Sequence, residues 1–213
     1  MAAGVTVVVD YGTCNIDSMV RALEECGATQ VMRSRDARDI DNADRIVLPG
    51  VGSFAAAMRN LRQYGLVDAL REASGSRSVP FLGACLGMQL MAGEGTEGGE
   101  GAGVPGLGLV AGLVDRLVPA NQGERIPHIG WNEVAAKSDS TLLAGLPANA
   151  DFYFVHSFHF QTADPAVEAG RTPFCGGFTS AIEDRERAIF GAQFHPEKSQ
   201  KNGFRLLRNF LAV

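Results

Sequence analysis

The stretch Gly83-Ala84-Cys85-Leu86-Gly87-Met88-Gln89 joins an apolar run typical of a β-strand, residues 79–82, to a run typical of a helix. A cysteine flanked by glycines is typical of a nucleophile on a sharp strand-to-helix turn, because a backbone that doubles back leaves little room for neighbouring side chains. Free N–H groups and the helix dipole at such a turn favour a thiolate and can hold an oxyanion. We therefore predict that Cys85 is a nucleophile. A buried structural cysteine is the alternative, but it would require neither the glycines nor the helix.

The downstream run His195-Pro196-Glu197 predicts the base that serves this thiol. A histidine alone is more often structural. Glu197, two residues after His195, changes this interpretation. In an extended backbone the two side chains lie on the same side, so the carboxylate can orient the imidazole. We predict a triad of Cys85 as nucleophile, His195 as base and Glu197 as the orienting group.

Apolar runs alternate with helical periodicity through the first half of the chain. The predicted strands cover residues 5–9, 30–32, 45–49 and 79–82, and the predicted helices cover residues 16–26, 54–63 and 66–74. Near-continuous apolar strands separated by helices predict a parallel sheet with right-handed crossovers.

The second half of the chain has a different character. Half of residues 93–108 are glycine, which predicts a mobile surface loop. Short strands are predicted at residues 109–118, 130–134, 151–155 and 158–161, a hairpin at residues 178–194 that turns at Asp184-Arg185, and a final helix at residues 203–211. We predict a three-layer α/β fold in which helices flank a central, mainly parallel sheet with antiparallel edge strands, built as a single domain over residues 1–213.

Length and charge exclude several classes of protein. The chain has 213 residues and a formal net charge of -5 at pH 7, which gives no basic field for nucleic acid or for an anionic membrane. Four cysteines without a C-x-x-C pair predict reduced thiols and a cytoplasmic protein. His156 and His159 have a spacing loosely like that of zinc ligands, but no cysteine pair completes a set. We expect neither a metal nor a cofactor.

The run Pro49-Gly50-Val51-Gly52-Ser53-Phe54 follows a predicted strand and precedes a predicted helix. A phosphate-binding loop is disfavoured because the run lacks the lysine of that motif. A loop with two glycines beside the nucleophile can instead offer a second N–H group to an oxyanion, and a plain turn is the alternative.

Six segments together resemble class I glutamine amidotransferases. They are Asp10-Tyr11-Gly12 with Asn15, Pro49 to Phe54, Gly83 to Leu90, Pro127-His128-Ile129-Gly130-Trp131-Asn132, Tyr153-Phe154-Val155-His156-Ser157, and Gln193-Phe194-His195-Pro196-Glu197-Lys198-Ser199. The resemblance extends from the first predicted strand to the last helix. The G-x-C-x-G part is common to the whole family, whereas the P-H-x-G-W-N and H-P-E-K-S parts resemble the glutaminase subunits of imidazole glycerol phosphate synthase.

The resemblance implies a glutaminase that releases glutamate and ammonia through a cysteine thioester. It implies an oxyanion hole made by the backbone N–H groups of Val51, Gly52 and Leu86. It also implies that glutamine is bound by Gly52, Gln89, His156 and Ser157.

The resemblance also implies a heterodimer in which ammonia passes to a partner. That partner is a (β/α)8-barrel cyclase, which forms imidazole glycerol phosphate and an aminoimidazole carboxamide nucleotide in histidine biosynthesis and regulates the glutaminase allosterically. The docking face implied by the resemblance consists of Asn15, Trp131, Asn132, Tyr153 and Lys198. Without the resemblance, a lone tryptophan would be assigned to the core.

Three other interpretations remain open at this point. Residues 178–182 and 200–203 also resemble paralogues that supply ammonia to enzymes amidating surface sugars. A catalytically silent scaffold is a second alternative, which the intact Cys85, His195 and Glu197 disfavour. A hydrolase of another substrate with a cysteine on a sharp turn is a third, but it leaves the segments around Trp131 and Lys198 unexplained.

Overall fold

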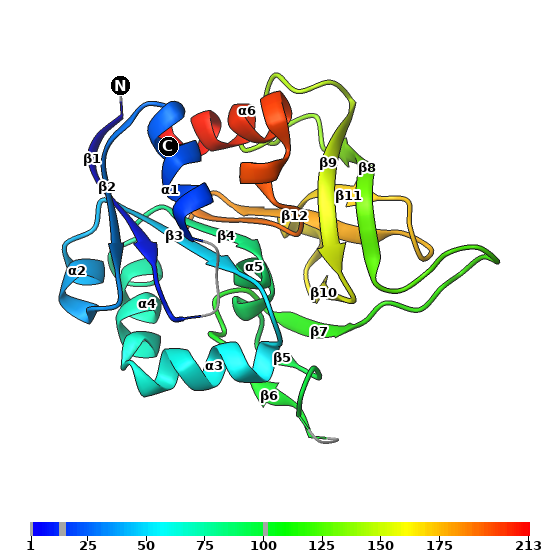
Figure 1. Cartoon of the computed structure of the whole chain (residues 1–213), viewed down its shortest axis with the longest axis horizontal. Coiled ribbons are helices and arrows are strands. Elements are labelled where there is room, and N and C mark those ends of the chain that lie inside the picture. Colours follow the sequence, from blue (N-terminus) through cyan, green and yellow to red (C-terminus); the bar gives the residue numbers. More distant parts are fainter. Residues whose placement is uncertain (1, 13–15, 100–101) are drawn as a thin grey trace.

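The computed structural model describes residues 2–12, 16–99 and 102–213, and its main feature is one long mixed sheet (Figure 1). The strands of this sheet are β1 (Ala2–Val9), β2 (Ala28–Ser34), β3 (Arg45–Gly50), β4 (Phe81–Cys85), β8 (His128–Ala136), β9 (Asn149–His156), β11 (Glu168–Thr172), β12 (Phe178–Asp184) and β13 (Ile189–Ala192). Their order is β2-β1-β3-β4-β13-β12-β11-β8-β9. The first five strands in that order are parallel, and the pairing is antiparallel from β13 to β9. The predicted α/β class with antiparallel strands in the C-terminal half is confirmed.

Helices cover both faces of the sheet (Figure 1). They are α1 (Ile16–Glu25), α2 (Ala37–Asp41), α3 (Phe54–Gln63), α4 (Leu66–Ser74), α5 (Leu86–Leu90) and α6 (Gln200–Leu211), with 3-10 turns η1 (Pro165–Val167) and η2 (Pro196–Lys198). The side chains of α1 and α6 pack into one hydrophobic cluster, and those of α2 to α5 pack into the other. This arrangement gives the three layers that the sequence predicts.

The alternation of side chains explains why the central strands are apolar along most of their length. In β1, Val7 and Val9 pack under α2 to α5, while Val8 packs under α1 and α6. In β3, Leu48 and Val47 divide in the same way between the two clusters. Successive side chains of a strand point to opposite faces, so a strand covered on both sides is mostly apolar, although Thr6 of β1 is polar and buried.

The turn from β4 into α5 brings two backbones into contact. A Cβ on Gly83 would lie 2.7 Å from backbone atoms of Gly87, and a Cβ on Gly87 would overlap the carbonyl oxygen of Leu48 on β3. Both glycines are therefore required by the close approach of the chain to itself. The strand predicted at residues 79–82 is observed at residues 81–85, so Cys85 is the last residue of β4.

The glycine-rich segment is not the free loop that its composition predicts. It contains β5 (Glu94–Gly95) and β6 (Val104–Pro105), which join β7 (Gly112–Arg116) and β10 (Phe158–Thr162) in a sheet ordered β10-β7-β5-β6. The prediction was wrong at these two strands because β5 pairs with β7 and β6 pairs with β5, which a local composition cannot reveal. β7 is also shorter than the predicted strand at residues 109–118.

Other predicted elements are confirmed at their bounds or displaced by a few residues. The helices at residues 54–63 and 66–74 have the predicted limits, and the hairpin of β12 with β13 forms as expected. The last helix begins at Gln200 rather than at residue 203. In the described residues, no helix is both long enough and apolar enough to cross a membrane.

We expect Gly87→Ala to destabilise the fold by about 2 kcal/mol or more, because the new methyl group overlaps the Leu48 carbonyl and backbone must move. The free energy of unfolding from urea titration measures the change. Gly93→Ala is the matched control, since its Cβ would meet only the Gly112 carbonyl oxygen at 3.5 Å. Equal stability of the two variants would contradict the close-approach argument.

Candidate active site

Three neighbouring strands deliver the predicted catalytic residues to one edge of the sheet. β4 lies between β3 and β13, with Gly50 opposite Cys85 and Ala192 opposite Ala84. These strands are parallel, so their carboxyl ends meet at the same edge, where sites of open α/β sheets are found. His195 follows the end of β13 by three residues, which explains how two distant parts of the chain meet.

Cys85 occupies the strained position that the sequence predicts. It has a φ of +54°, a conformation that non-glycine residues seldom adopt. Its side chain is almost buried at 5% exposure. The Sγ atom lies 4.0 Å from the carbonyl oxygen of Val155, and Gln193 Nε2 donates to it at 3.9 Å.

His195 and Glu197 form the predicted pair, but by a different backbone route. His195 Nδ1 lies 2.8 Å from Glu197 Oε1, and both side chains are buried. The intervening residues form the 3-10 turn η2 rather than the extended backbone that we expected. The proline at the first position of this turn fixes a helical φ, so the turn, not strand alternation, brings the carboxylate to the ring.

The charge of His195 is set by its two neighbours. Burial lowers the pKa of the imidazole, but its interactions with the Cys85 sulfur and the Glu197 carboxylate outweigh burial and raise the pKa to about 10. The ring therefore carries its proton at neutral pH. This charge stabilises the fold below the unfolded pKa of about 6.5, and the stabilisation is lost as the pH rises through about 10.

A cavity of about 200 Å³ opens in front of Cys85. It is lined by Val51, Gly52, Cys85, Leu86, Gln89, Glu97, Val155, His156, Ser157 and Phe158. The structure thus brings together the residues predicted for the oxyanion hole and for glutamine binding. Leu86 is the first residue of α5, where backbone N–H groups lack partners within the helix.

Gln89 lines this cavity, and Gln193 lies buried behind it. Gln89 Nε2 donates to the Phe158 carbonyl oxygen at 2.8 Å and to Gln193 Oε1 at 3.0 Å. Both N–H groups of Gln89 are thereby used, which leaves its Oε1 as the atom free to accept from a ligand. Gln193 is fully buried and links Gln89 to the Cys85 sulfur.

Glu97 is a site residue that the sequence analysis missed. It lies in the glycine-rich segment, and its Oε2 accepts from the Phe54 N–H at 2.9 Å at the start of α3. Burial raises its pKa, and the Phe54 N–H and Arg116 act in the opposite direction. A negative charge in this segment gave no signal in the sequence, because only the pairing of β5 with β7 brings it to the cavity.

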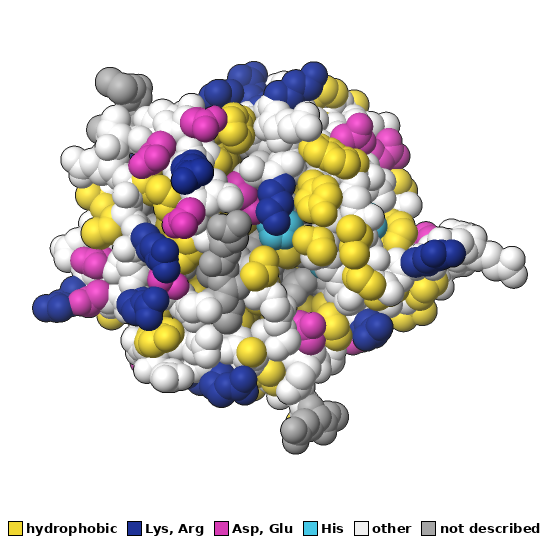
Figure 2. Space-filling view, viewed as in Figure 1, with side chains coloured by type: hydrophobic (Ala, Val, Ile, Leu, Met, Phe, Trp, Pro, Cys, Tyr) yellow, Lys and Arg dark blue, Asp and Glu magenta, His cyan; other side chains and the backbone are white. Residues whose placement is uncertain are grey.

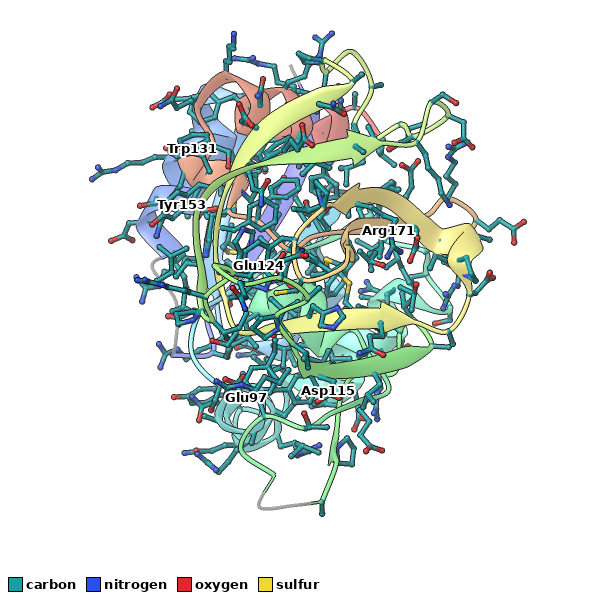
Figure 3. The ribbon with its side chains drawn as sticks, turned by 90° about the vertical axis from the view of Figure 1, so that its right-hand side faces the viewer. Glu97, Asp115, Glu124, Trp131, Tyr153 and Arg171 are labelled. Atoms are coloured by element: carbon teal, nitrogen blue, oxygen red, sulfur yellow. The ribbon has the colours of Figure 1, made fainter. Side chains whose placement is uncertain are left out.

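The predicted docking face lies on β8 and β9. Trp131 and Tyr153 are side by side (Figure 3), with ring centroids 6.1 Å apart. Trp131 is 50% exposed and Ile129 is 62% exposed. Hydrophobic side chains gather over these two strands beside a hollow in which a histidine is visible (Figure 2). Lys198 is exposed, and Asn132 is half-buried. Asn15 lies outside the described residues.

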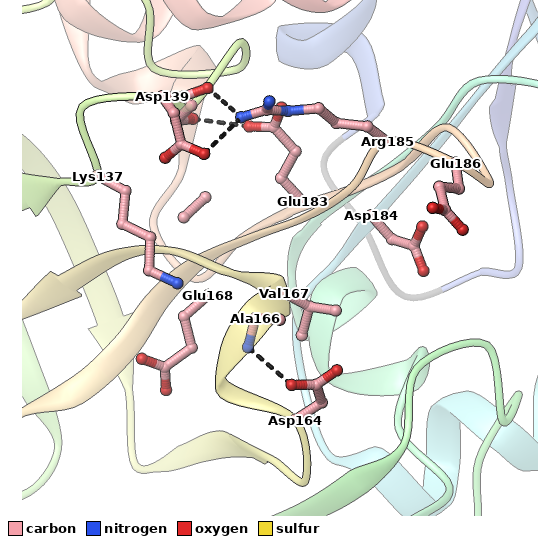
Figure 4. A pocket seen from close by; sticks show the side chains of 12 residues that line it. Lys137, Asp139, Asp164, Ala166, Val167, Glu168, Glu183, Asp184, Arg185 and Glu186 are labelled. Carbon is pink, nitrogen blue, oxygen red and sulfur yellow. Dashed lines mark hydrogen bonds and ion pairs between the residues drawn. The ribbon is translucent and has the colours of Figure 1, made fainter.

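A second hollow, of about 430 Å³, is lined mostly by charged side chains (Figure 4). Glu183 accepts from Ser140 Oγ at 2.7 Å and from Arg185 Nε at 2.7 Å, and Arg185 also pairs with Asp139. These charges therefore hold the turn after β8 against β12. The described residues contain no cluster of histidine, cysteine and acidic side chains able to hold a metal ion.

Comparison with known proteins identifies the family. The family model described as "Glutamine amidotransferase class-I" matches residues 7–213. The chain belongs to the class I glutamine amidotransferases. This amidotransferase is 45% identical over 211 residues to "Imidazole glycerol phosphate synthase subunit HisH" of Rhodospirillum rubrum, with 96% of each chain covered.

Further comparisons agree with this assignment. The amidotransferase is 44% identical over 211 residues to the protein of the same name from Cereibacter sphaeroides, with 97% of each chain covered. A solved structure described as "Crystal structure of glutamine amidotransferase" superposes with a TM-score of 0.73 at 20% identity and 97% coverage of both chains. The predicted resemblance to this subunit is confirmed by the relatives, and the predicted fold by the solved structure.

We expect Glu197→Gln to lower the pKa of His195, because the neutral amide no longer stabilises the imidazolium. The pKa is read from an NMR titration of the His195 ring protons. Glu186→Gln, which removes an exposed carboxylate, is the control and should leave the titration unchanged. An unchanged His195 pKa in Glu197→Gln would contradict the role given to this carboxylate.

Proposed function

We propose that this amidotransferase is the glutaminase subunit of imidazole glycerol phosphate synthase and that residues 1–213 form one glutaminase domain. The observation that carries the proposal is Cys85 on a strained turn, where its sulfur interacts with the His195 imidazole that Glu197 holds at 2.8 Å. The names of relatives 44–45% identical over almost the whole chain support the choice of this subunit among amidotransferases. The three described cysteines are free, which suits a reaction in the cytoplasm.

In the first half of the reaction, Cys85 attacks the side-chain amide carbon of glutamine as a thiolate, its proton being held by His195. The developing oxyanion accepts hydrogen bonds from backbone N–H groups of Leu86 and of the Val51-Gly52 loop, which line the same cavity. His195 holds a proton at neutral pH and donates it to the departing nitrogen. The C–N bond breaks, ammonia leaves, and a glutamyl thioester remains on Cys85.

In the second half, water hydrolyses the thioester. His195, now neutral, removes a proton from the attacking water and keeps it, while the C–S bond breaks and the sulfur leaves as a thiolate. Glutamate is released, and Cys85 with His195 returns to its starting state. Glu197 keeps one ring tautomer in place throughout, because its oxygen accepts from Nδ1.

The shape and charge of the cavity support glutamine as the substrate. Glu97 lines the same cavity as the nucleophile, so its carboxylate can pair with the α-ammonium group of glutamine. Gln89 Oε1 adds a second acceptor for the same group. The backbone of His156 and Ser157 forms the remaining wall, and residue 52 offers an N–H beside the reacting carbonyl.

We further propose that the face of β8 and β9 binds a (β/α)8-barrel cyclase that consumes the ammonia. Exposed Trp131 beside Tyr153 supports this, because exposed aromatic pairs are common anchors of protein interfaces. A small hollow is lined both by His195 and by exposed Lys198. Because this hollow lies between His195 and a residue of the docking face, it supports the release of ammonia toward that face.

We expect Cys85→Ala in the complex to abolish synthesis that uses glutamine and to leave synthesis from ammonium salt intact. The substitution removes the nucleophile but does not touch the site that consumes ammonia. Formation of imidazole glycerol phosphate, followed with each nitrogen source, measures the effect. Cys26→Ala is the matched control, because Cys26 lies on the far side of the sheet from the cavity, against α6. Loss of both activities in Cys85→Ala would refute the division of labour.

We expect Glu97→Gln to raise the KM for glutamine about 10- to 100-fold, the range for one lost charge-assisted hydrogen bond. The amide oxygen can still accept from the Phe54 N–H, so the start of α3 and the free energy of unfolding should change little. Initial rates over a glutamine series separate KM from kcat. Glu94→Gln, an exposed neighbour in β5, is the control. A fall in kcat alone would contradict a binding role for Glu97.

A further inference from the structure

A row of hydrogen bonds leads from β8 to the glutamine cavity without using the catalytic residues. Asn132 Nδ2 lies 3.1 Å from His128 Nε2, and His128 Nδ1 lies 3.0 Å from His156 Nε2. His156 Nδ1 lies 2.8 Å from the Phe158 carbonyl oxygen. His128 and His156 face each other across the β8–β9 ladder, so the register of the sheet sets their contact.

The partners at the two ends fix the direction of every bond in this row. A carbonyl oxygen only accepts, so His156 Nδ1 carries the hydrogen and its Nε2 must accept from His128 Nδ1. His128 Nε2 then has a lone pair and accepts from the Asn132 amide. The amide orientation is fixed in turn, because Asn132 Oδ1 accepts from the Glu133 N–H at 2.9 Å.

The surroundings keep both rings neutral, as this arrangement requires. His128 stacks on Phe174 with centroids 4.1 Å apart and also contacts Phe154 and Phe178. Burial lowers the pKa of His128 to about 4 and that of His156 to about 3. A second proton on either ring would place two N–H groups face to face.

We propose that Asn132 and His128 are positioning residues that hold the corner between β9 and β10 in its glutamine-binding geometry through a one-directional hydrogen-bond chain ending at the Phe158 carbonyl. The corner carries the Val155 carbonyl that contacts the Cys85 sulfur and the His156-Ser157 backbone that lines the cavity. Gln89 also donates to the Phe158 carbonyl at 2.8 Å, so the chain and this cavity-lining side chain share one acceptor. The inference rests on the proposed function, because it assigns these residues to glutamine binding.

The proposal makes a distinction that packing alone does not. Asn132→Asp keeps the shape of the side chain but cannot donate, so it draws a hydrogen onto His128 Nε2 and leaves two lone pairs between His128 and His156. Asn132→Ala removes the side chain but lets His128 keep its hydrogen on Nδ1. The hydrogen-bond chain therefore predicts that Asn132→Asp weakens glutamine binding more than Asn132→Ala does. A packing role predicts the opposite order.

The first readout is the tautomer of each ring, from nitrogen-15 NMR of the histidine-labelled protein at pH 8. The chain has four histidines, so single His→Phe variants assign the signals. We expect His128 and His156 to carry hydrogen on Nδ1 in the unmodified protein and in Asn132→Ala. In Asn132→Asp we expect His128 to leave that state. An Nε2–H tautomer of His128 in the unmodified protein would overturn the proposal.

The second readout is alkylation of Cys85, followed by mass spectrometry of its peptide. A chloromethyl ketone shaped like glutamine reports the cavity, and iodoacetamide reports the thiol. Asn132→Asp should slow alkylation of Cys85 by the chloromethyl ketone about tenfold, as expected for one buried hydrogen bond. Asn132→Ala should slow it less, and the rate of alkylation by iodoacetamide should not change in either variant. Asn149→Asp, the same change at an exposed position of β9, is the control.

The outcomes separate this proposal from the proposed function. A larger loss in Asn132→Ala than in Asn132→Asp, or equal rates in Asn132→Asp and Asn149→Asp, would overturn the positioning role. Failure of the chloromethyl ketone to label Cys85 in the unmodified protein would instead refute glutamine as the ligand. In that event the NMR tautomers still decide whether the hydrogen-bond chain exists.

Discussion

The close packing of the β4–α5 turn against β3 is the constraint on which the active site depends. Two backbone segments meet where Gly87 touches the Leu48 carbonyl, and this contact forces the turn to be sharp enough to hold Cys85 at a positive φ. The thiol then projects beyond the sheet, and the first N–H groups of α5 lie behind it. A looser turn would carry the same residues but would not aim the sulfur and the first N–H groups of α5 at one point.

The site contains histidines in opposite charge states, and their partners explain the difference. His195 faces a carboxylate and a sulfur, which favour the imidazolium, and its pKa is raised. One ring nitrogen of His156 faces a carbonyl oxygen, and the other faces the ring of His128. Phe178 packs against the His156 ring, and burial lowers the pKa of His156. Burial acts in the same direction on both rings, so hydrogen-bond partners decide which of them carries a proton.

Sequence reasoning succeeded where the physical signal is local. The paired glycines around Cys85, the apolar runs of the parallel strands and the periodicity of α3 and α4 all derive from neighbours in the chain. The spacing of His195 and Glu197 predicted their pairing even though the backbone between them is a 3-10 turn. These features require little knowledge of the rest of the molecule.

Features that depend on distant contacts could not be predicted. α2 is only five residues long, and β11 (Glu-Ala-Gly-Arg-Thr) has almost no apolar pattern, because its pairing with β8 and β12 stabilises it. Glu97 could not be predicted for the same reason, because the pairing of β5 with β7 places it at the cavity. The hydrogen-bond chain from Asn132 to Phe158 could not be predicted either, because ring tautomers depend on hydrogen-bond partners in the folded structure and not on sequence spacing.

The hydroxyl of Ser199 has a consequence for how the catalytic imidazole is supported. It donates to the His195 carbonyl at 2.6 Å and accepts from the Tyr153 N–H at 3.0 Å, while the His195 N–H donates to the Tyr153 carbonyl at 3.0 Å. The main chain of β9 is thus fastened to the segment that bears the imidazole irrespective of which aromatic ring occupies position 153. Mechanical continuity between the outer strand and the His195 segment therefore does not depend on the side chain at position 153, so a substitution there leaves this support in place.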